Sequence, residues 1–192
     1  IILPKAFPVR KMLPLLAILA VLAVTTLQLR IQGRRWWCAC GQPNLWTGDP
    51  NGSHNSQHLF DPYSFTHVLH GVLFFWLLAW TCRRMPLAWR LWLTVGIESL
   101  WEVVENSAFV IERYRTATAA VGYEGDSVAN SIGDILSCVL GFVIARVLGF
   151  WWSLALFFVT EAILLLWIKD DLLINVVMLI HPVSWIKEWQ GR

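Results

Sequence analysis

Long apolar runs alternate with short polar connections over most of the chain. A helix needs roughly 20 apolar residues to cross the hydrocarbon of a bilayer. Five runs approach or reach that length: 12–30, 66–82, 87–111, 127–147 and 150–168. A shorter run, 172–186, is broken by His181-Pro182, so it either spans, re-enters or lies at the interface. The pattern predicts an all-α fold, a polytopic transmembrane bundle of five to six helices formed by residues 1–192 as one domain.

The one long polar stretch, residues 31–65, lies between the first two runs and is expected to be a loop outside the membrane. Orientation follows from the distribution of Lys and Arg, which are enriched in cytoplasmic loops. With six spans and a cytoplasmic N-terminus, nine Lys and Arg residues lie inside and six outside. With five spans this bias disappears. The count favours six spans with both termini inside, although the sixth run also suits a re-entrant or interfacial helix.

Composition agrees with a membrane setting. The chain is 57% hydrophobic and only 15% charged, against about 25% charged residues in soluble domains, and its mean hydropathy is +0.56. Tryptophan, which favours the bilayer interface, occurs 13 times. The formal net charge is only +2 and the basic residues are scattered at the ends of runs. Nucleic acid is therefore excluded as a partner.

Histidines are concentrated around the start of the second run. His54, His58, His67 and His70 lie close together in the sequence, and Asp61 stands between the two pairs. His67 and His70 share one face of a helix, so with loop ligands they could hold a metal ion. The alternative is a polar loop whose histidines bond to water and backbone. Nearby, Cys38-Ala-Cys40 could form a disulfide, bind a metal or be ordinary loop cysteines.

Two later runs carry polar stripes. Glu98, Glu102 and Glu105 lie on one face of the third predicted helix, and Asp126, Asn130 and Asp134 repeat every fourth residue at the start of the fourth. Charged side chains facing lipid are costly, so both stripes should face the bundle interior. Asp126 also suits a helix cap, and the glutamates could serve packing alone. With a cytoplasmic N-terminus the stripes and His67 reach one depth, which predicts a single cavity open to the outer side.

An all nitrogen and oxygen ligand set suits zinc, iron or manganese. Such an ion would activate water or polarise a carbonyl or phosphoryl group. The predicted metal ligands are His54, His58, Asp61, His67, His70, Glu102, Glu105 and Asp126. The predicted catalytic carboxylates are Glu102, Glu105 and Asp126, with a glutamate as general base. The predicted substrate-binding residues are Arg113, Tyr114, Arg115 and Asn130, with the arginines alternatively anchoring a helix end at the headgroups.

Several motifs resemble an uncharacterised family of alphaproteobacterial inner-membrane proteins. The resemblance runs from about residue 34 to the end of the chain. It rests on Arg34-Arg-Trp-Trp-Cys-Ala-Cys-Gly41, Leu45-Trp-x-Gly48, Ser53-His-Asn-Ser-Gln-His-Leu59, Asp61-Pro-Tyr-Ser-Phe-Thr-His67, Glu105-Asn-Ser107 and Arg113-Tyr-Arg115. It implies a location in the bacterial inner membrane and little about activity. Separately, Asp126-x-x-x-Asn-x-x-Gly133 is similar to helices of VanZ-like membrane proteins, over one helix.

Three functions fit these features. The first is a metal-dependent hydrolase, transferase or oxidase acting on a lipid or lipid-linked substrate at the outer membrane face. The second is a transporter whose buried acids carry protons or a cation, although acidic and basic residues do not continue through the inner half of the predicted bundle. The third is a scaffold for a membrane complex, which leaves the buried acids unexplained. The enzyme is the favoured interpretation.

Overall fold

In the computed structural model of the protein, residues 9–42, 44–120 and 122–192 are described. Their regular structure is helical apart from one isolated bridge between Trp46 and Phe60. The helices are α1 (Val9–Ile31), α2 (Ser64–Thr81), α3 (Leu87–Glu105), α4 (Ala108–Ala117), α5 (Val128–Leu148), α6 (Phe150–Ile168), α7 (Leu172–Ile180) and α8 (Ser184–Gln190). The predicted all-α class is confirmed.

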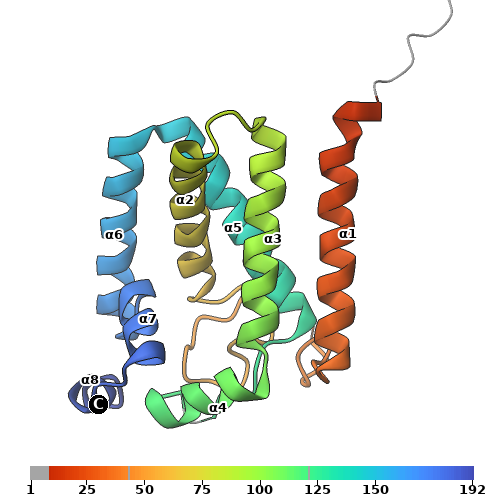
Figure 1. The fold of residues 1–192 in the computed structure, drawn as a ribbon. Coiled ribbons are helices and arrows are strands. Elements are labelled where there is room, and N and C mark those ends of the chain that lie inside the picture. Colours follow the sequence, from red (N-terminus) through yellow and green to blue (C-terminus); the bar gives the residue numbers. More distant parts are fainter. Residues whose placement is uncertain (1–8, 43, 121) are drawn as a thin grey trace, which may run out of the picture.

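Five long helices stand side by side and form the bundle (Figure 1). Four of them, α1, α2, α5 and α6, are long and apolar enough to cross a membrane. Helix α3 is of similar length, 19 residues, but it carries Arg90 and three glutamates. Because α3 lies among the other long helices, these charged groups enter the bundle with it, in agreement with a helical membrane protein.

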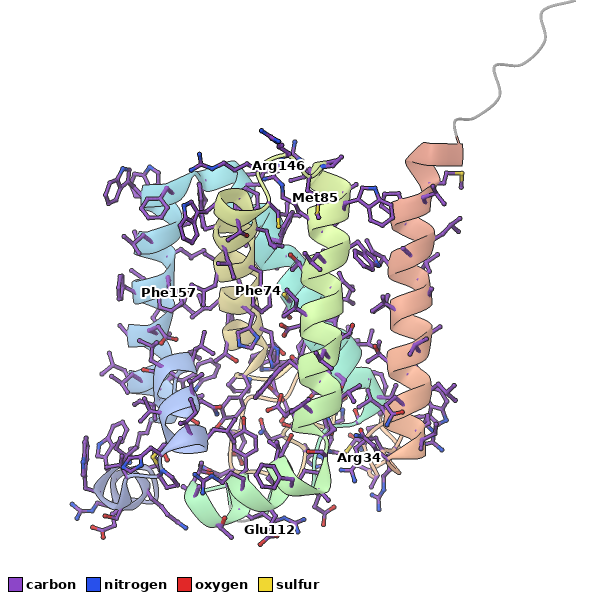
Figure 2. All side chains as sticks on the ribbon, in the orientation of Figure 1. Arg34, Phe74, Met85, Glu112, Arg146 and Phe157 are labelled. Carbon is purple, nitrogen blue, oxygen red and sulfur yellow. The ribbon has the colours of Figure 1, made fainter. Side chains whose placement is uncertain are left out.

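The two ends of the bundle differ in construction. At one end, here the turn end, short connections join α2 to α3 and α5 to α6 (Figure 1). At the other, here the loop end, lie the loop of residues 32–63 and the short helices α4, α7 and α8. Figure 2 shows Met85 and Arg146 at the turn end, and Arg34 and Glu112 at the loop end. Most of the irregular polar backbone is therefore gathered at the loop end.

The predicted third span, 87–111, is wrong at its end, because α3 stops at Glu105 and a separate helix, α4, follows. Asn106 is buried and its side chain pairs with Asp126, accepting from the Asp126 N–H at 2.7 Å and donating to Asp126 Oδ2 at 2.9 Å. Ser107 has extended backbone and caps α4 by accepting from the Val110 N–H. The chain turns here because Asn106 is tied to a distant segment.

The run 172–186 does not cross the bundle. Helix α7 has only 9 residues, and both α7 and α8 lie at the loop end beside α4 (Figure 1). Arg113 of α4 donates to the last carbonyls of α7, and Lys187 of α8 donates to the Thr116 carbonyl. This corrects the charge argument for six spans, because Lys187 and Arg192 now belong to the loop end. Lys5, which also entered that count, lies outside the described residues, and the cytoplasmic N-terminus stays a prediction.

Helices α2 and α5 make the closest contact in the bundle, and glycines permit it. A Cβ atom at Gly71 of α2 would collide with the Cys138 carbonyl of α5, and a Cβ atom at Gly141 of α5 would collide with the Val68 carbonyl. Small residues at such crossings let helix backbones approach within a membrane. The contact fixes α2 and α5 in register beside the polar side chains.

Candidate functional site

The loop end begins with backbone contacts between the loop and the start of α5. Ser127, Val128 and Ala129 donate their N–H groups to the carbonyls of Ser56, Arg35 and Trp36, at 2.9, 2.8 and 3.1 Å. The first N–H groups of a helix lack partners within it, so the loop supplies them. The side-chain cap of α5 is Ser127, which accepts from the Asn130 N–H at 3.1 Å, and not Asp126 as the capping alternative expected.

Asp61 fastens the loop to the start of α2. Its carboxylate is buried and accepts the backbone N–H groups of Ser56 and Tyr63, both at 2.8 Å, and of Ser64 at 3.3 Å. Burial raises the pKa of Asp61, and these N–H donors oppose the rise because they favour the carboxylate. Predicted as a metal ligand, Asp61 instead has both oxygens engaged by the backbone.

The four neighbouring histidines separate into two groups, which corrects the expectation that all four serve one metal ion. His54 and His58 lie with Cys38 and Cys40 in the loop. His67 and His70 point from α2 toward α3. The second group belongs to the bundle site, defined here as His67, His70, Glu98, Glu102 and Glu105.

Glu98 lies between the two bundle histidines. Its Oε1 atom is 2.5 Å from His67 Nδ1, and both its oxygens are 3.1 Å from His70 Nδ1. Glu98 is fully buried, while the His70 side chain is 16% exposed. His70 is thus partly exposed, as is Glu105, and Phe74 and Trp101 lie beside the His70 ring.

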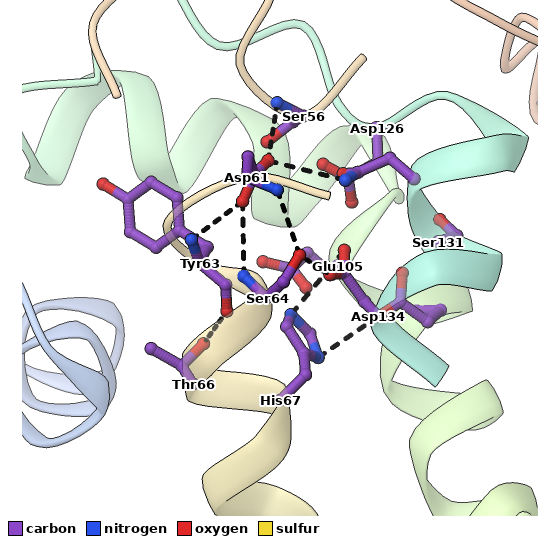
Figure 3. A network of polar contacts seen from close by, with 12 residues as sticks. Ser56, Asp61, Tyr63, Ser64, Thr66, His67, Glu105, Asp126, Ser131 and Asp134 are labelled. Atoms are coloured by element: carbon purple, nitrogen blue, oxygen red, sulfur yellow. Dashed lines mark hydrogen bonds and ion pairs between the residues drawn. The ribbon is translucent and has the colours of Figure 1, made fainter. Parts of the chain in front are cut away.

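One turn nearer the loop end, His67 meets a second set of carboxylates. One ligand atom each from His67, Glu102 and Glu105 lies within 4.8 Å of the others. Glu102 Oε1 is 3.5 Å from His67 Nδ1, and Asp134 Oδ2 of α5 is 3.9 Å from His67 Nε2. Figure 3 shows His67, Glu105 and Asp134 converging below Asp61 and Ser64. Ser64 donates to Asp134 Oδ1 at 2.8 Å, which holds that side chain in place.

The bundle site carries an excess of carboxylates. With Asp134 there are four carboxyl groups against two imidazoles, and Glu98 and Glu102 are completely buried. Even two doubly protonated histidines would not balance four carboxylates. Buried charges persist only when they are paired or coordinate a metal. Additional protons or a cation must therefore supply positive charge here.

Asp126 and Asn130 lie beside this site but face other partners. Asp126 accepts from Asn106 Nδ2 and from the Tyr123 hydroxyl, both at 2.9 Å. Burial raises the pKa of Asp126, and these two hydrogen bonds oppose the rise. Asn130 Nδ2 donates weakly to Asp61 at 3.4 Å. Neither residue joins the converging ligand atoms, so the predicted ligand role of Asp126 lacks support from its position.

The predicted substrate-binding residues of α4 have structural contacts. Arg113 donates to the carbonyls of Leu179 and Ile180 at 2.9 and 3.1 Å, and Arg115 donates to the Tyr123 carbonyl at 2.5 Å. The Tyr114 hydroxyl is 3.1 Å from Glu105 Oε1 and 2.9 Å from Asn175 Oδ1. Tyr114 therefore touches the bundle site directly, while both arginines fasten neighbouring segments together.

Sequence reasoning left Glu98 and Asp134 out of the predicted ligand set. Both had been recognised on the polar stripes that face the bundle interior. The missing signal was the spacing of His67 and His70. Because His70 is almost one turn further along α2, it pairs with the residue one turn earlier on the antiparallel α3, which is Glu98.

The comparisons with known proteins agree on one family. A family model described as "Protein of unknown function (DUF2585)" matches residues 29–192. A UPF0314 protein of Brucella anthropi is 44% identical over 176 residues, 92% of this chain and 89% of the relative. One of Paracoccus denitrificans is 41% identical over 188 residues, 98% and 97% of the two chains. One of Rhizobium etli is 47% identical over 177 residues, 91% and 90%.

No solved structure matches the chain significantly. The similarity of residues 126–133 to VanZ-like proteins is not supported by these comparisons. The relatives come from alphaproteobacteria, as the sequence resemblance implied. Because the family model covers most of the chain and the relatives match over nearly their whole length, the chain belongs to the DUF2585 family of alphaproteobacterial proteins.

Proposed function

We propose that the protein is a metal-dependent enzyme of the bacterial inner membrane that acts on the head group of a lipid or lipid-linked substrate. The ion is held by His67, Glu102 and Glu105, at the loop end of the bundle. In this proposal the loop end faces the periplasm and the N-terminus lies in the cytoplasm.

One observation carries the proposal: the state of the Glu102 carboxylate. It is fully buried, and neither of its oxygens has a hydrogen-bond partner among the described residues. His67 Nδ1, its nearest basic neighbour, already contacts Glu98 at the shorter distance of 2.5 Å. A buried polar atom without a partner costs about 1–3 kcal/mol, and more when charged. A metal ion bonded to Glu102 removes that cost.

The number of ligands favours chemistry over a purely structural role. Catalytic metal sites keep three protein ligands and leave a position for water or substrate, whereas structural zinc sites are closed by four. His67, Glu102 and Glu105 supply three. Because imidazole and carboxylate ligands suit several divalent metals, zinc, iron and manganese all fit this set.

The depth of the site favours a head group as substrate. His67 is the fourth residue of α2, and Glu102 is the fourth from the end of α3. With a rise of 1.5 Å per residue, both lie about 5 Å inside the helix ends. Chemistry at that depth is close to lipid head groups and far from the middle of the acyl chains.

The remaining residues have distinct tasks in this proposal. Glu98 orients both imidazoles, as carboxylates commonly orient metal-bound histidines. Tyr114 positions Glu105 through its hydroxyl. A bound ion would lower the pKa of a water and polarise a carbonyl or phosphoryl group. Asp134, held by Ser64 and facing His67, is placed to accept a proton.

Transport is the less supported alternative. A proton or cation path would have to continue from Glu98 to the turn end. In the described parts of α2, α3 and α5, the segments between the bundle site and the turn end contain no aspartate or glutamate. Glu161 of α6 is engaged elsewhere, because its carboxylate accepts the N–H groups of Leu172 and Leu173 at the start of α7.

Metal content tests the proposal first. Mass spectrometry on detergent-purified protein should find a stoichiometric transition metal that is lost in His67→Ala, Glu102→Gln and Glu105→Ala. Glu112→Gln and His181→Ala are matched controls, since both side chains are exposed and away from the site. Folded wild-type protein whose metal content is the same as that of these three variants would overturn the proposal and favour proton-coupled transport or scaffolding.

Activity is the second measurement. Metal-loaded protein would be placed in proteoliposomes made from a total membrane lipid extract, and the lipids compared by mass spectrometry before and after incubation. A head-group change that requires metal and is absent with Glu102→Gln would identify the substrate class. Metal binding without any lipid change would keep the metal site and exclude the lipid-directed enzyme.

A further inference from the structure

The loop of residues 32–63 contains a second cluster of metal-ligating side chains, separate from the bundle site. It comprises Cys38, Cys40, His54 and His58, here called the loop site. The residues follow the pattern Cys-x-Cys-x13-His-x3-His. The typical sequence pattern of such a zinc site is two cysteines, a gap of about 12–15 residues, and two histidines with 3–5 residues between them. The loop departs from this only in having one residue between the cysteines.

The fold brings these side chains together. One ligand atom from each of the four residues lies within 4.8 Å of the others. Cys38 Sγ is 3.3 Å from His54 Nδ1, and Cys40 Sγ is 4.0 Å from His58 Nε2. Bond lengths of about 2.3 Å to sulfur and 2.0 Å to nitrogen place the ligands of a tetrahedral zinc about 3.3–3.8 Å apart. The loop needs little contraction to reach that geometry.

The loop site is half-buried, because Cys38 and His58 are buried whereas Cys40 and His54 are exposed. The Cys40 N–H points to Cys38 Sγ at 3.5 Å. His58 is buried, with the His54 ring stacked on it at 5.5 Å and Trp37 against it at 6.4 Å. All four cysteines of the chain are free thiols, so Cys38 and Cys40 are available as ligands.

The loop site joins the two segments of the loop that bind the start of α5. Arg35 and Trp36, which accept hydrogen bonds from Val128 and Ala129, precede Cys38. Ser56, which accepts from Ser127, lies between His54 and His58. A single ion bonded to both segments would fix three backbone contacts to α5 at once. It would also hold Ser56, whose N–H donates to Asp61 at the start of α2.

We propose that the loop site binds one structural zinc ion, distinct from the metal of the bundle site. Two thiolates and two imidazoles in tetrahedral arrangement are typical of zinc. The four protein ligands leave no position for substrate, which is the pattern of a structural site. The zinc closes the loop against α5 and so keeps the loop end of the bundle in place.

Cobalt substitution separates this ion from the one in the bundle site, because only thiolate ligands give intense sulfur-to-metal charge-transfer absorption. The full chain would be purified in detergent under reducing conditions and its zinc content measured, then exchanged with cobalt(II). Cys38→Ser/Cys40→Ser and His58→Ala should each lose one zinc per chain and the absorption band. Cys82→Ser, a cysteine in the turn between α2 and α3, is the matched control and should keep both.

Hydrogen exchange gives a second readout that does not depend on variants. Removing zinc from wild-type protein with a chelator should speed exchange of the Ser127, Val128 and Ala129 amides about tenfold or more, and zinc should restore the slow rate. Glu102→Gln should leave the cobalt band and these amides unchanged, so the loop site stands or falls independently of the proposed enzyme.

Three results would overturn the loop site. The first is the absence of a charge-transfer band from cobalt-bound wild-type protein whose thiols are free. The second is a zinc content of the cysteine double variant equal to that of the wild type. The third is a disulfide between Cys38 and Cys40 in freshly isolated protein, detected by mass spectrometry.

Discussion

The loop site and the bundle site lie at the same end of the molecule but are assembled in different ways. The loop site takes all its ligands from residues 38–58, so one continuous segment supplies two thiolates and two imidazoles. The bundle site takes histidines from α2 and carboxylates from α3, with Asp134 of α5 alongside. The loop site depends on local folding, whereas the bundle site depends on the register of three helices.

The chemistry of the two sites differs in the same direction. Soft sulfur ligands in a closed set of four suit a permanent structural zinc. Hard oxygen ligands suit an ion with an open position, and one of them is a buried carboxylate that has no hydrogen-bond partner in the described part of the chain. In these proposals, one end of a small membrane protein holds a structural metal and a reactive metal. Each keeps its own ligands, provided that the residues between the two sites keep them apart.

Asp61 is the residue that connects the two sites, and its removal should have the largest effect. Asp61→Ala leaves the N–H groups of Ser56, Tyr63 and Ser64 without their acceptor. Each buried donor without a partner costs about 1–3 kcal/mol. We expect a loss of roughly 3 kcal/mol or more in stability and loss of metal from both sites, measured by thermal denaturation in detergent and by metal analysis.

Asp49→Ala is the control for this experiment. Asp49 lies in the same loop, but it is exposed, and among the described residues its carboxylate accepts only the N–H of Asn51. It should retain both metals. If Asp61→Ala lost metal from only one site, the two sites would not share the support that the structure gives them.

Glu102 and Glu105 should contribute unequally to the bundle site. Among the described residues, neither oxygen of Glu102 has a hydrogen-bond partner, whereas Glu105 is held by the Tyr114 hydroxyl. Because loss of a residue that only supports a metal ligand costs about 10–100-fold in affinity, Glu102→Gln should weaken metal affinity by about 100-fold or more, and Glu105→Gln by about 10-fold or more. Equilibrium titration with zinc or manganese measures both. Equal losses would show that the unpartnered state of Glu102 carries no special weight.

Apolar run length determined most of the fold in advance. The predicted span 150–168 matches α6, and α5 and α2 differ from their predictions by only one or two residues at an end. The predicted end of the third span was wrong because Asn106 looks like a mid-helix residue until its partner Asp126, 20 residues away, is known. The prediction of a sixth crossing was wrong because Arg113 and Lys187 hold α7 and α8 beside α4. Such long-range contacts produce no recognisable pattern in the local sequence.

The candidate sites divide in the same way. Helical periodicity alone placed His67, Glu102 and Glu105 on inward faces, and the structure brings them together. Periodicity could not assign Glu98 to His70, since that needs the relative depth of two antiparallel helices. The loop site was within reach of the sequence through its cysteine and histidine spacing. It was missed because His54 and His58 were combined with His67 and His70.

Gly133 tests whether the loop can be moved without removing any ligand. A Cβ atom here would collide with the backbone carbonyl of Leu59, between His58 and Asp61. Gly133→Ala should push the loop from α5 and cost about 1–3 kcal/mol, as overpacking does. Gly96→Ala is the control, because among the described residues no atom from outside its own stretch of helix lies within 4 Å of its Cβ position. Thermal denaturation and hydrogen exchange of Ser127 to Ala129 report the change.

Gly133→Ala also sharpens the comparison between the sites. We expect faster exchange at the start of α5 and weaker zinc retention in the loop, while His67 keeps its contact with Glu98 one turn deeper. If Gly133→Ala lost the bundle metal and kept the loop zinc, the expectation would be wrong. The bundle site would then depend on the position of the loop more strongly than the loop site does.

A titrating group that belongs to neither site should change the pH dependence of stability without changing metal content. Burial raises the pKa of Asp170, between α6 and α7, to about 7, and its Oδ2 lies 3.4 Å from the Tyr63 hydroxyl. The neighbouring Asp171 carboxylate, which caps α7, also raises this pKa. Because the folded protein holds this proton more tightly than the unfolded chain, whose Asp pKa is about 3.9, Asp170 favours folding at low pH. That contribution is lost as pH rises from about 4 to 7, at no more than about 1.4 kcal/mol per pH unit.

Asp170→Asn removes this titration and retains an oxygen that can accept the Asp171 N–H, bonded at 3.0 Å. Thermal denaturation in detergent between pH 4.5 and pH 8, with both sites loaded, should therefore fall less steeply with pH for Asp170→Asn than for wild type. The metal content of the variant should not change. An unchanged pH slope would show that Asp170 is already ionised in the folded protein, and a lost metal would mean that the segment joining α6 to α7 supports the bundle site through Tyr63.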